Sequence, residues 1–253
     1  MRVIAITNQK GGSGKTTTTV NLAAALAEKR RNVLIIDLDA QRHSSLWYGI
    51  NIEDGGVYSV MVDNKDIVDN VHVSDVESVS ILPSSKMMMR IEKALSGEVG
   101  AEIILKNKLN KLKSYDYVLI DCPPQLMTTT INALCAAHEI IVPVETHVLA
   151  LQGLADLIMT FETVKDRINK DIEISGILAC RLDKRTRHGR EALESMKRRF
   201  KKLCFKTVIR ENVKLSEAPS FEQPITKYAP SSNGAEDYRA LAKEVIKQEG
   251  KRG

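Results

Sequence analysis

Short apolar runs alternate with longer amphipathic stretches along most of the chain. The runs are rich in Val, Ile and Leu, as the buried strands of a parallel sheet are. They predict strands over 3–6, 33–37, 79–83, 117–121, 140–144 and 174–179. Helical spacing of apolar residues predicts helices over 17–29, 152–167, 189–202 and 235–248. This alternation predicts an α/β fold, a three-layer sandwich in which helices flank a mostly parallel central sheet.

A glycine-rich segment follows the first predicted strand and precedes the first predicted helix. It runs Lys10-Gly11-Gly12-Ser13-Gly14-Lys15-Thr16-Thr17. In this strand–loop–helix context, backbone N–H groups and a helix N-terminus can surround phosphate oxygens. We expect Lys15 to contact the β- and γ-phosphates of a nucleotide and Thr16 to ligate Mg²⁺. The segment therefore predicts a P-loop.

This segment departs from the common pattern G-x-x-x-x-G-K-[ST]. Gln9 stands where the pattern has its first glycine, and a second lysine, Lys10, lies five residues before Lys15. A lysine at the start of the loop can reach across a dimer interface to the phosphates of a partner. There it would stabilise charge that develops in the transition state, as an arginine finger does.

Acidic residues end two of the predicted strands, at the edge of a parallel sheet where ligands bind. Asp37 and Asp121 are the last residues of their strands, and Asp39 follows Asp37 by two. Helix capping or turn formation is the structural alternative, but the neighbouring P-loop favours a functional role. Asp121 suits the Walker B role of holding Mg²⁺ through water. Asp39 is a candidate for positioning the attacking water and for helping to hold the metal.

Positive charge is concentrated in one part of the chain. The formal net charge is +5, but residues 181–210 contain twelve basic and three acidic residues, which leaves the remainder at −4. Such a segment on a mildly acidic body indicates an anionic polymer or surface as partner. A solvated helix face is the structural alternative.

Length and composition narrow the protein class. The 253 residues suffice for one sizeable domain, so we expect 1–253 to be a single domain with no N-terminal helix-turn-helix. No apolar run approaches the roughly 20 residues of a membrane span, and no signal peptide is visible. Four widely spaced cysteines predict reduced thiols in a cytoplasmic protein.

Together, these motifs resemble the ParA/Soj family of deviant-Walker-A ATPases, which includes MinD. The loop matches K-G-G-x-G-K-[ST]-[ST] at every fixed position. Four further segments match: 37–41 (D-x-D-P-Q, with Ala40 in place of proline), 120–124 (I-D-x-P-P), 149–154 (Y-A-L-E-G-L) and 212–220 (N-V-R-L-S-E-A-P-S). The resemblance therefore covers nearly the whole chain.

The resemblance implies an activity and a set of partners. The family hydrolyses ATP slowly with Mg²⁺, forms a nucleotide-sandwich homodimer and binds double-stranded DNA without sequence preference in that state. A ParB-like partner or cargo adaptor stimulates hydrolysis, so that a plasmid, a chromosome or another cargo is segregated or positioned. The implied location is the cytoplasm, with nucleoid association when ATP is bound and no stable membrane anchoring. Lys10, Lys15, Asp39 and Asp121 are the implied catalytic residues.

The resemblance also implies nucleotide and DNA contacts outside the loop. The family's adenine pocket corresponds to Arg210 and Asn212, although Arg210-Glu211 replaces the usual Pro-Arg pair here. Lys214 replaces a family arginine that is linked to DNA. The other candidate DNA contacts in the basic segment are Arg185, Arg187, Arg190, Lys197 and Arg198.

Two other classes of function remain alternatives. A membrane-cycling regulator like MinD needs a C-terminal amphipathic helix with bulky apolar residues, and residues 242–253 contain few of them. An ATP-dependent metallocluster carrier, such as the nitrogenase iron protein, needs clustered ligands, and the cysteine spacing argues against it. Liposome co-sedimentation and metal analysis would distinguish these alternatives.

Overall fold

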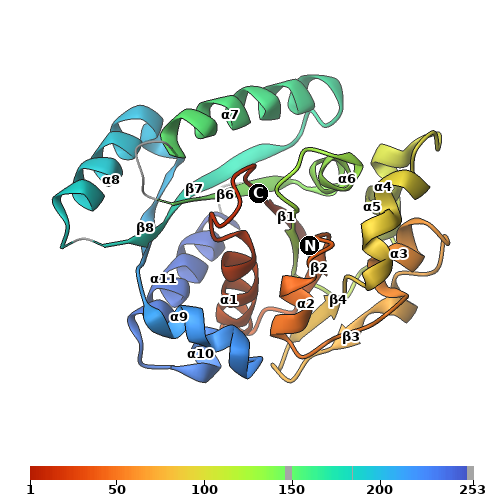
Figure 1. The fold of residues 1–253 in the computed structure, drawn as a ribbon, viewed down its shortest axis with the longest axis horizontal. Helices are drawn as coiled ribbons and strands as arrows, with labels where there is room; N and C mark the ends of the chain where they lie inside the picture. Colours follow the sequence, from red (N-terminus) through yellow and green to blue (C-terminus); the bar gives the residue numbers. More distant parts are fainter. Residues whose placement is uncertain (146–149, 184, 250–253) are drawn as a thin grey trace.

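A computed structural model describes residues 1–145, 150–183 and 185–249. Its centre is an eight-stranded sheet with the strand order β3-β4-β2-β5-β1-β6-β7-β8 (Figure 1). All neighbouring strands are parallel except β3, which pairs antiparallel with β4 at one edge. The predicted three-layer α/β sandwich with a mostly parallel sheet is therefore confirmed.

The strands follow the sequence pattern closely, because buried parallel strands require uninterrupted apolar runs. Their bounds are β1 Arg2–Ile6, β2 Val33–Asp37, β3 His72–Val73, β4 Val79–Leu82, β5 Tyr117–Asp121, β6 Glu139–Glu145, β7 Glu173–Leu182 and β8 Cys204–Arg210. In the register of the sheet, Asp121 at the end of β5 lies beside both Ile6 of β1 and Asp37 of β2. The carboxyl ends of these central strands therefore bring the two acids to the loop that follows β1.

The helices connect these strands across both faces of the sheet. The α-helices are α1 Lys15–Ala27, α2 His43–Trp47, α3 Gly56–Met61, α4 Ile91–Ala94, α5 Ile104–Leu109, α6 Thr128–Ala136, α7 Ala150–Arg167, α8 Arg187–Phe200, α9 Val213–Glu217, α10 Ile225–Tyr228 and α11 Asn233–Lys247. Short 3₁₀ turns are η1 Val68–Asn70, η2 Lys86–Arg90, η3 Ala101–Ile103, η4 Lys201–Leu203 and η5 Ala218–Phe221. None of the helices in the described part of the chain is long and apolar enough to cross a membrane.

Two hydrophobic cores lie on opposite faces of the sheet. Alternation along β1 sends Ile4 and Ile6 into the core beneath α1 and α11, and Val3 and Ala5 into the other. The first core also holds side chains of α2, α9 and α10. The second is covered by α3 to α8. In Figure 1, α1 and α11 lie side by side, and they are in direct contact.

Several elements were not predicted from the sequence. Strand β8 lies inside the basic segment, and its apolar residues Phe205, Val208 and Ile209 are buried. Strand β3 has only two residues, and the helices of four to six residues are too short to show a periodic pattern of apolar positions. The basic segment thus runs from the end of β7 through α8 and η4 into the edge strand β8.

Candidate nucleotide site

The P-loop forms the floor of a cavity of about 590 Å³. Gly12 and Gly14 adopt left-handed backbone conformations, with φ of 74° and 94°, which favour glycine. Gly14 is the N-cap of α1, so the helix begins at Lys15 with its N-terminus directed at the loop. A Cβ atom on Gly11 or Gly12 would have no atom within 4 Å, so the loop is open to the cavity at these residues. All predicted loop residues from Gly11 to Thr17 line this cavity.

Lys15 is nearly buried at the start of α1, with a relative exposure of 7%. Its Nζ donates a hydrogen bond of 3.3 Å to the carbonyl oxygen of Lys10, across the loop. Burial lowers the pKa of Lys15, while the negative charges of Asp121 and Asp39 act in the opposite direction. The ammonium group of Lys15 therefore lies inside the loop and near two carboxylates. Phosphate oxygens of a nucleotide bound in the loop would be within its reach.

Asp121 is fully buried at the end of β5, and its two carboxylate oxygens differ in their hydrogen bonding. Its Oδ2 accepts a hydrogen bond of 2.7 Å from the hydroxyl of Ser44. Its Oδ1 has no hydrogen-bond partner among the described residues. Burial raises the pKa of Asp121, and the hydroxyls of Ser44 and Thr16 oppose that shift. An unpartnered buried carboxylate oxygen beside Thr16 and Lys15 fits a metal-dependent phosphate site, since Mg²⁺ prefers oxygen ligands.

The described side chains include no group of three or more His, Cys, Asp or Glu that could hold a metal by themselves. This agrees with the way Mg²⁺ binds in nucleotide sites, where one or two carboxylates act together with water and substrate phosphates. The residues present therefore fit a metal that arrives with a nucleotide.

Asp39 lines the same cavity from the loop after β2. Its backbone is fixed on both sides: its N–H donates to Asp37 Oδ1 at 3.2 Å, and its carbonyl accepts from the Ser84 hydroxyl at 2.8 Å. Its Oδ1 accepts the N–H of Gln41 at 2.9 Å. Asp37 itself is fully buried and accepts hydrogen bonds from Ser45, so it supports this loop. The structure thus brings Asp39 to the cavity and gives Asp37 a structural role.

Lys10 lies at the rim of the site and points to a carboxylate of its own chain. Its side chain is 46% exposed, and Nζ lies 3.3 Å from Glu145 Oε2. Unlike the other loop residues predicted to contact nucleotide, Lys10 does not line the cavity. This position suits a cation that acts outside its own site.

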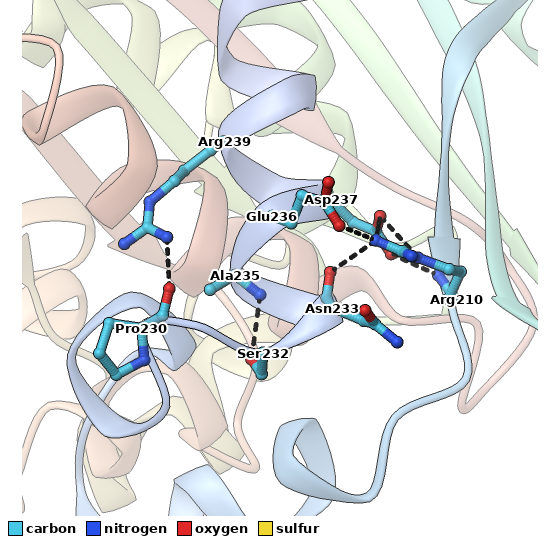
Figure 2. A network of polar contacts seen from close by, with 8 residues as sticks. All are labelled: Arg210, Pro230, Ser232, Asn233, Ala235, Glu236, Asp237 and Arg239. Carbon is cyan, nitrogen blue, oxygen red and sulfur yellow. Dashed lines mark hydrogen bonds and ion pairs between the residues drawn. The ribbon is translucent and has the colours of Figure 1, made fainter.

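Arg210 and Asn212 both line the cavity, and each also makes hydrogen bonds within the chain. Figure 2 shows the Arg210 guanidinium turned toward the first turn of α11, where it contacts Asp237 and Glu236. The N–H of Arg210 also donates to Asp237, at 2.9 Å. Asn212 is the N-cap of α9, and its Oδ1 accepts the N–H of Lys214 at 2.9 Å. Their contacts with a nucleotide base remain a prediction.

None of the six candidate DNA residues lines the cavity: Arg185 precedes α8, Lys214 is in α9 and the other four are in α8. Three of them are tied to near neighbours: Arg185 pairs with Asp183, Arg187 with Glu191, and Lys214 with Glu217. Arg190 Nη1 donates to the carbonyl oxygen of Arg185, and Lys197 and Arg198 are exposed on α8. All six side chains are accessible, and their role in DNA binding remains a prediction.

Sequence reasoning missed four residues around the site. Ser44 holds Asp121, and Glu145 holds Lys10. Arg181 lines the cavity and also pairs with Glu145, at 3.2 Å. Cys180 packs against Gly14, since a Cβ built there would lie 3.5 Å from its Sγ. Glu145 could have been identified from the sequence, because it directly follows the predicted strand 140–144. Asp37 and Asp121 were identified by their positions at the ends of predicted strands.

The segment 149–154, which resembles the family motif Y-A-L-E-G-L, lies partly outside the described residues. Leu149 lies outside the described residues, as do the side chains of residues 150–154. The backbone of the latter begins α7.

Comparison with known proteins extends the likeness over nearly the whole chain. A family model described as an AAA domain matches residues 1–174. The chain is 43% identical over 247 residues to the sporulation initiation inhibitor protein Soj of Bacillus subtilis, covering 96% of this chain and 98% of Soj. It is 37% identical over 251 residues to the chromosome partitioning protein ParA of Myxococcus xanthus, covering 98% and 89%. The solved structure of the septum site-determining protein MinD from Pyrococcus horikoshii, complexed with Mg-ADP, matches with a TM-score of 0.82 at 28% identity, covering 100% of this chain and 98% of MinD.

Proposed function

Because this chain belongs to the ParA/Soj family of P-loop ATPases, we propose that it is a partition or positioning ATPase that ATP switches between a monomer and a DNA-binding dimer. The observation that supports this proposal best is the different placement of the two lysines. Lys15 lies inside the loop, whereas Lys10 lies at its rim and outside the cavity.

The chemistry is Mg²⁺-dependent hydrolysis of ATP. Mg²⁺, when bound with the nucleotide, supplies positive charge at the phosphate oxygens. Lys15 and the backbone N–H groups of the loop would bind the phosphates, while Thr16 and Asp121, whose Oδ1 has no partner among the described residues, would hold the metal directly or through water. Asp39 orients the attacking water from its fixed loop. In this arrangement Ser44 keeps the Asp121 carboxylate in one orientation.

The dimer supplies the missing cation. Lys10 of each subunit reaches the phosphates bound by its partner and stabilises the charge that develops during phosphoryl transfer. Neither site is complete without its partner, so hydrolysis is slow in the monomer. The rate of hydrolysis therefore depends on dimerisation.

DNA binding follows from the exposed basic surface. The basic residues of α8 and Lys214 neutralise DNA phosphates, which gives an affinity that depends on salt and not on sequence. Pairing two copies doubles the number of phosphate contacts, so the dimer binds far more tightly than the monomer. A ParB-like or cargo-bound partner then stimulates hydrolysis and releases the complex.

Three substitutions test this proposal in the full chain. We expect Lys15→Ala to abolish nucleotide binding, because it removes the ammonium group from the loop. Lys10→Ala should bind nucleotide but fail to dimerise or to hydrolyse it, and full dimerisation and turnover would contradict the role across the interface. Asp39→Ala should accumulate as an ATP-bound dimer, and normal turnover would remove its role in positioning water.

The structural likeness to MinD favours one second candidate, a spatial regulator that cycles on membranes. This candidate predicts that the protein sediments with anionic liposomes in the presence of ATP and not of ADP. The partition proposal predicts no such co-sedimentation, together with ATP-dependent retention on duplex DNA.

A further inference from the structure

Strand β6 holds the start of the P-loop at two points, through a backbone carbonyl and through a side chain. Asn8, which is buried, donates from Nδ2 to the carbonyl oxygen of Pro143 at 2.7 Å, and its Oδ1 accepts the N–H of Lys10 at 3.0 Å. Two residues along the strand from Pro143, Glu145 receives the Lys10 side chain. The first contact fixes the Lys10 backbone, and the second fixes only its ammonium group. Changing Glu145 would therefore release the ammonium group and leave the backbone anchored.

Glu145 is shared by two cations, one on each carboxylate oxygen. Lys10 Nζ lies 3.3 Å from Oε2, and Arg181 Nη1 lies 3.2 Å from Oε1. The carboxylate side chain is only 16% exposed, whereas those of Lys10 and Arg181 are 46% and 60% exposed. The two cations are therefore more accessible to solvent or to a ligand than the carboxylate that they share.

The backbone at Arg181 is irregular in a way that directs this side chain. Arg181 has a φ of 51°, and the pairing of β7 with β8 shifts register between Ala179 and Leu182. Bulges of this kind re-aim side chains near functional sites. The result is a second cation that lines the nucleotide cavity and contacts Glu145 at the same time.

We propose that Glu145 is a positioning residue that holds Lys10 within its own subunit until two nucleotide-bound copies meet. Arg181 keeps the carboxylate paired when Lys10 leaves for the partner's phosphates. Glu145 and Arg181 together then set the protein concentration at which the dimer forms. This inference rests on the proposed function of Lys10 across the interface.

Substituting Glu145 and substituting Arg181 should have opposite effects on dimerisation. Glu145→Gln removes the charge that holds Lys10, so the dimer should form at a lower concentration. A partly exposed ion pair changes such an equilibrium about two- to fivefold, and a symmetric dimer releases two lysines, so the dissociation constant should fall roughly tenfold. Arg181→Gln removes one of the two cations described on Glu145, so the carboxylate should hold Lys10 more strongly and the dissociation constant should rise by a similar factor.

The test is sedimentation velocity of the full chain over a series of protein concentrations, with Mg²⁺ and a non-hydrolysable ATP analogue. Glu53→Gln is the matched control, since it removes a carboxylate from an exposed pair with Lys86, away from the cavity. Arg181→Lys retains the positive charge and should dimerise like the parent chain. Thermal unfolding of every variant confirms that each is folded at the assay temperature.

The expected pattern is stronger dimerisation for Glu145→Gln, weaker for Arg181→Gln, and no change for Glu53→Gln or Arg181→Lys. The inference is overturned if Glu145→Gln dimerises like the parent chain, or if Glu145→Gln and Arg181→Gln shift the dissociation constant in the same direction. Lys10→Ala separates this failure from that of the proposed function. If Lys10→Ala dimerises normally, the role of Lys10 across the interface is wrong, whereas impaired Lys10→Ala with unchanged Glu145→Gln removes only the role of Glu145.

Discussion

Glu92 caps a helix to which it does not belong, and its removal should destabilise the fold measurably. Met127, the N-cap of α6, provides no side-chain hydrogen bond to the helix. Glu92 of α4 accepts hydrogen bonds instead from the backbone N–H groups of Thr128 and Thr129, both at 3.0 Å, and from the Thr129 hydroxyl at 2.8 Å. Its negative charge also lies at the positive end of the helix dipole. Because α6 follows Asp121 and Pro124, this cap anchors one wall of the nucleotide site.

The size of the effect follows from these three contacts. Loss of an N-cap costs about 0.5–2 kcal/mol, and hydrogen bonds to a charged group are the stronger ones. Because Glu92 is half-exposed, water replaces part of what is lost. We expect Glu92→Ala to lower the free energy of unfolding by about 2 kcal/mol. Glu92→Gln, which keeps an acceptor oxygen but no charge, should cost roughly half as much.

The dependence on pH has a definite sign. Burial alone would raise the pKa of Glu92, but the hydrogen bonds from Thr129 and Thr128 outweigh it and lower the pKa below its ordinary value. The stabilisation is therefore present above the unfolded pKa of about 4.3 and is lost as the pH falls through the lower folded value. Urea unfolding at neutral pH and near pH 3 should show a difference between the parent and Glu92→Gln that shrinks in acid.

The control for this series is Glu98→Ala, at an exposed position in the loop after α4. We expect it to change stability by less than about 0.5 kcal/mol. The reasoning would be refuted if Glu92→Ala cost no more than Glu98→Ala, or if the difference between the parent and Glu92→Gln grew as the pH fell.

Three further substitutions test other parts of the structure. Gly56→Ala should destabilise the fold strongly in urea unfolding, because φ is 56° and its Cβ would lie 2.0 Å from a backbone carbonyl oxygen; a stability equal to that of the parent would contradict the packing. Arg210→Ala should lower the unfolding free energy by roughly 1 kcal/mol after allowance for solvent exposure, since it breaks the contacts with Asp237, and an unchanged urea midpoint would show that the pair contributes nothing. Ser44→Ala should weaken the effect of Mg²⁺ on the affinity for a fluorescent ATP analogue, because Asp121 loses the hydrogen bond that orients it; an unchanged effect of Mg²⁺ would remove the role of Ser44.

The central sheet and the phosphate loop could be predicted from the sequence because their signals are local. Apolar runs ending in Asp37 and Asp121 placed both acids at one edge of the sheet, and the register confirms that they are neighbours. Gly12 and Gly14 adopt left-handed backbone conformations that other residue types rarely adopt, so glycines at these positions are a strong local signal. Strong local constraints of this kind leave little choice to tertiary packing.

The parts that could not be predicted depend on contacts between distant segments. The pair of Lys10 and Glu145 joins residues 135 positions apart, and that of Arg210 and Asp237 joins residues 27 apart. No periodic pattern connects such residues, since each contact follows from the packing of segments that are distant in the sequence. Strand β8 was missed because Lys206 and Thr207 interrupt its apolar residues, so that no uninterrupted apolar run marks it.

The most direct test of the central claim is the affinity of the full chain for random-sequence duplex DNA, measured with Mg-ATP and with Mg-ADP across a salt series. The switch predicts tight binding only with ATP and a logarithm of the affinity that falls linearly with the logarithm of the salt concentration. In the same assay, Lys10→Ala should bind weakly with either nucleotide. Binding that is equally tight with both nucleotides, or that is insensitive to salt, would contradict the account.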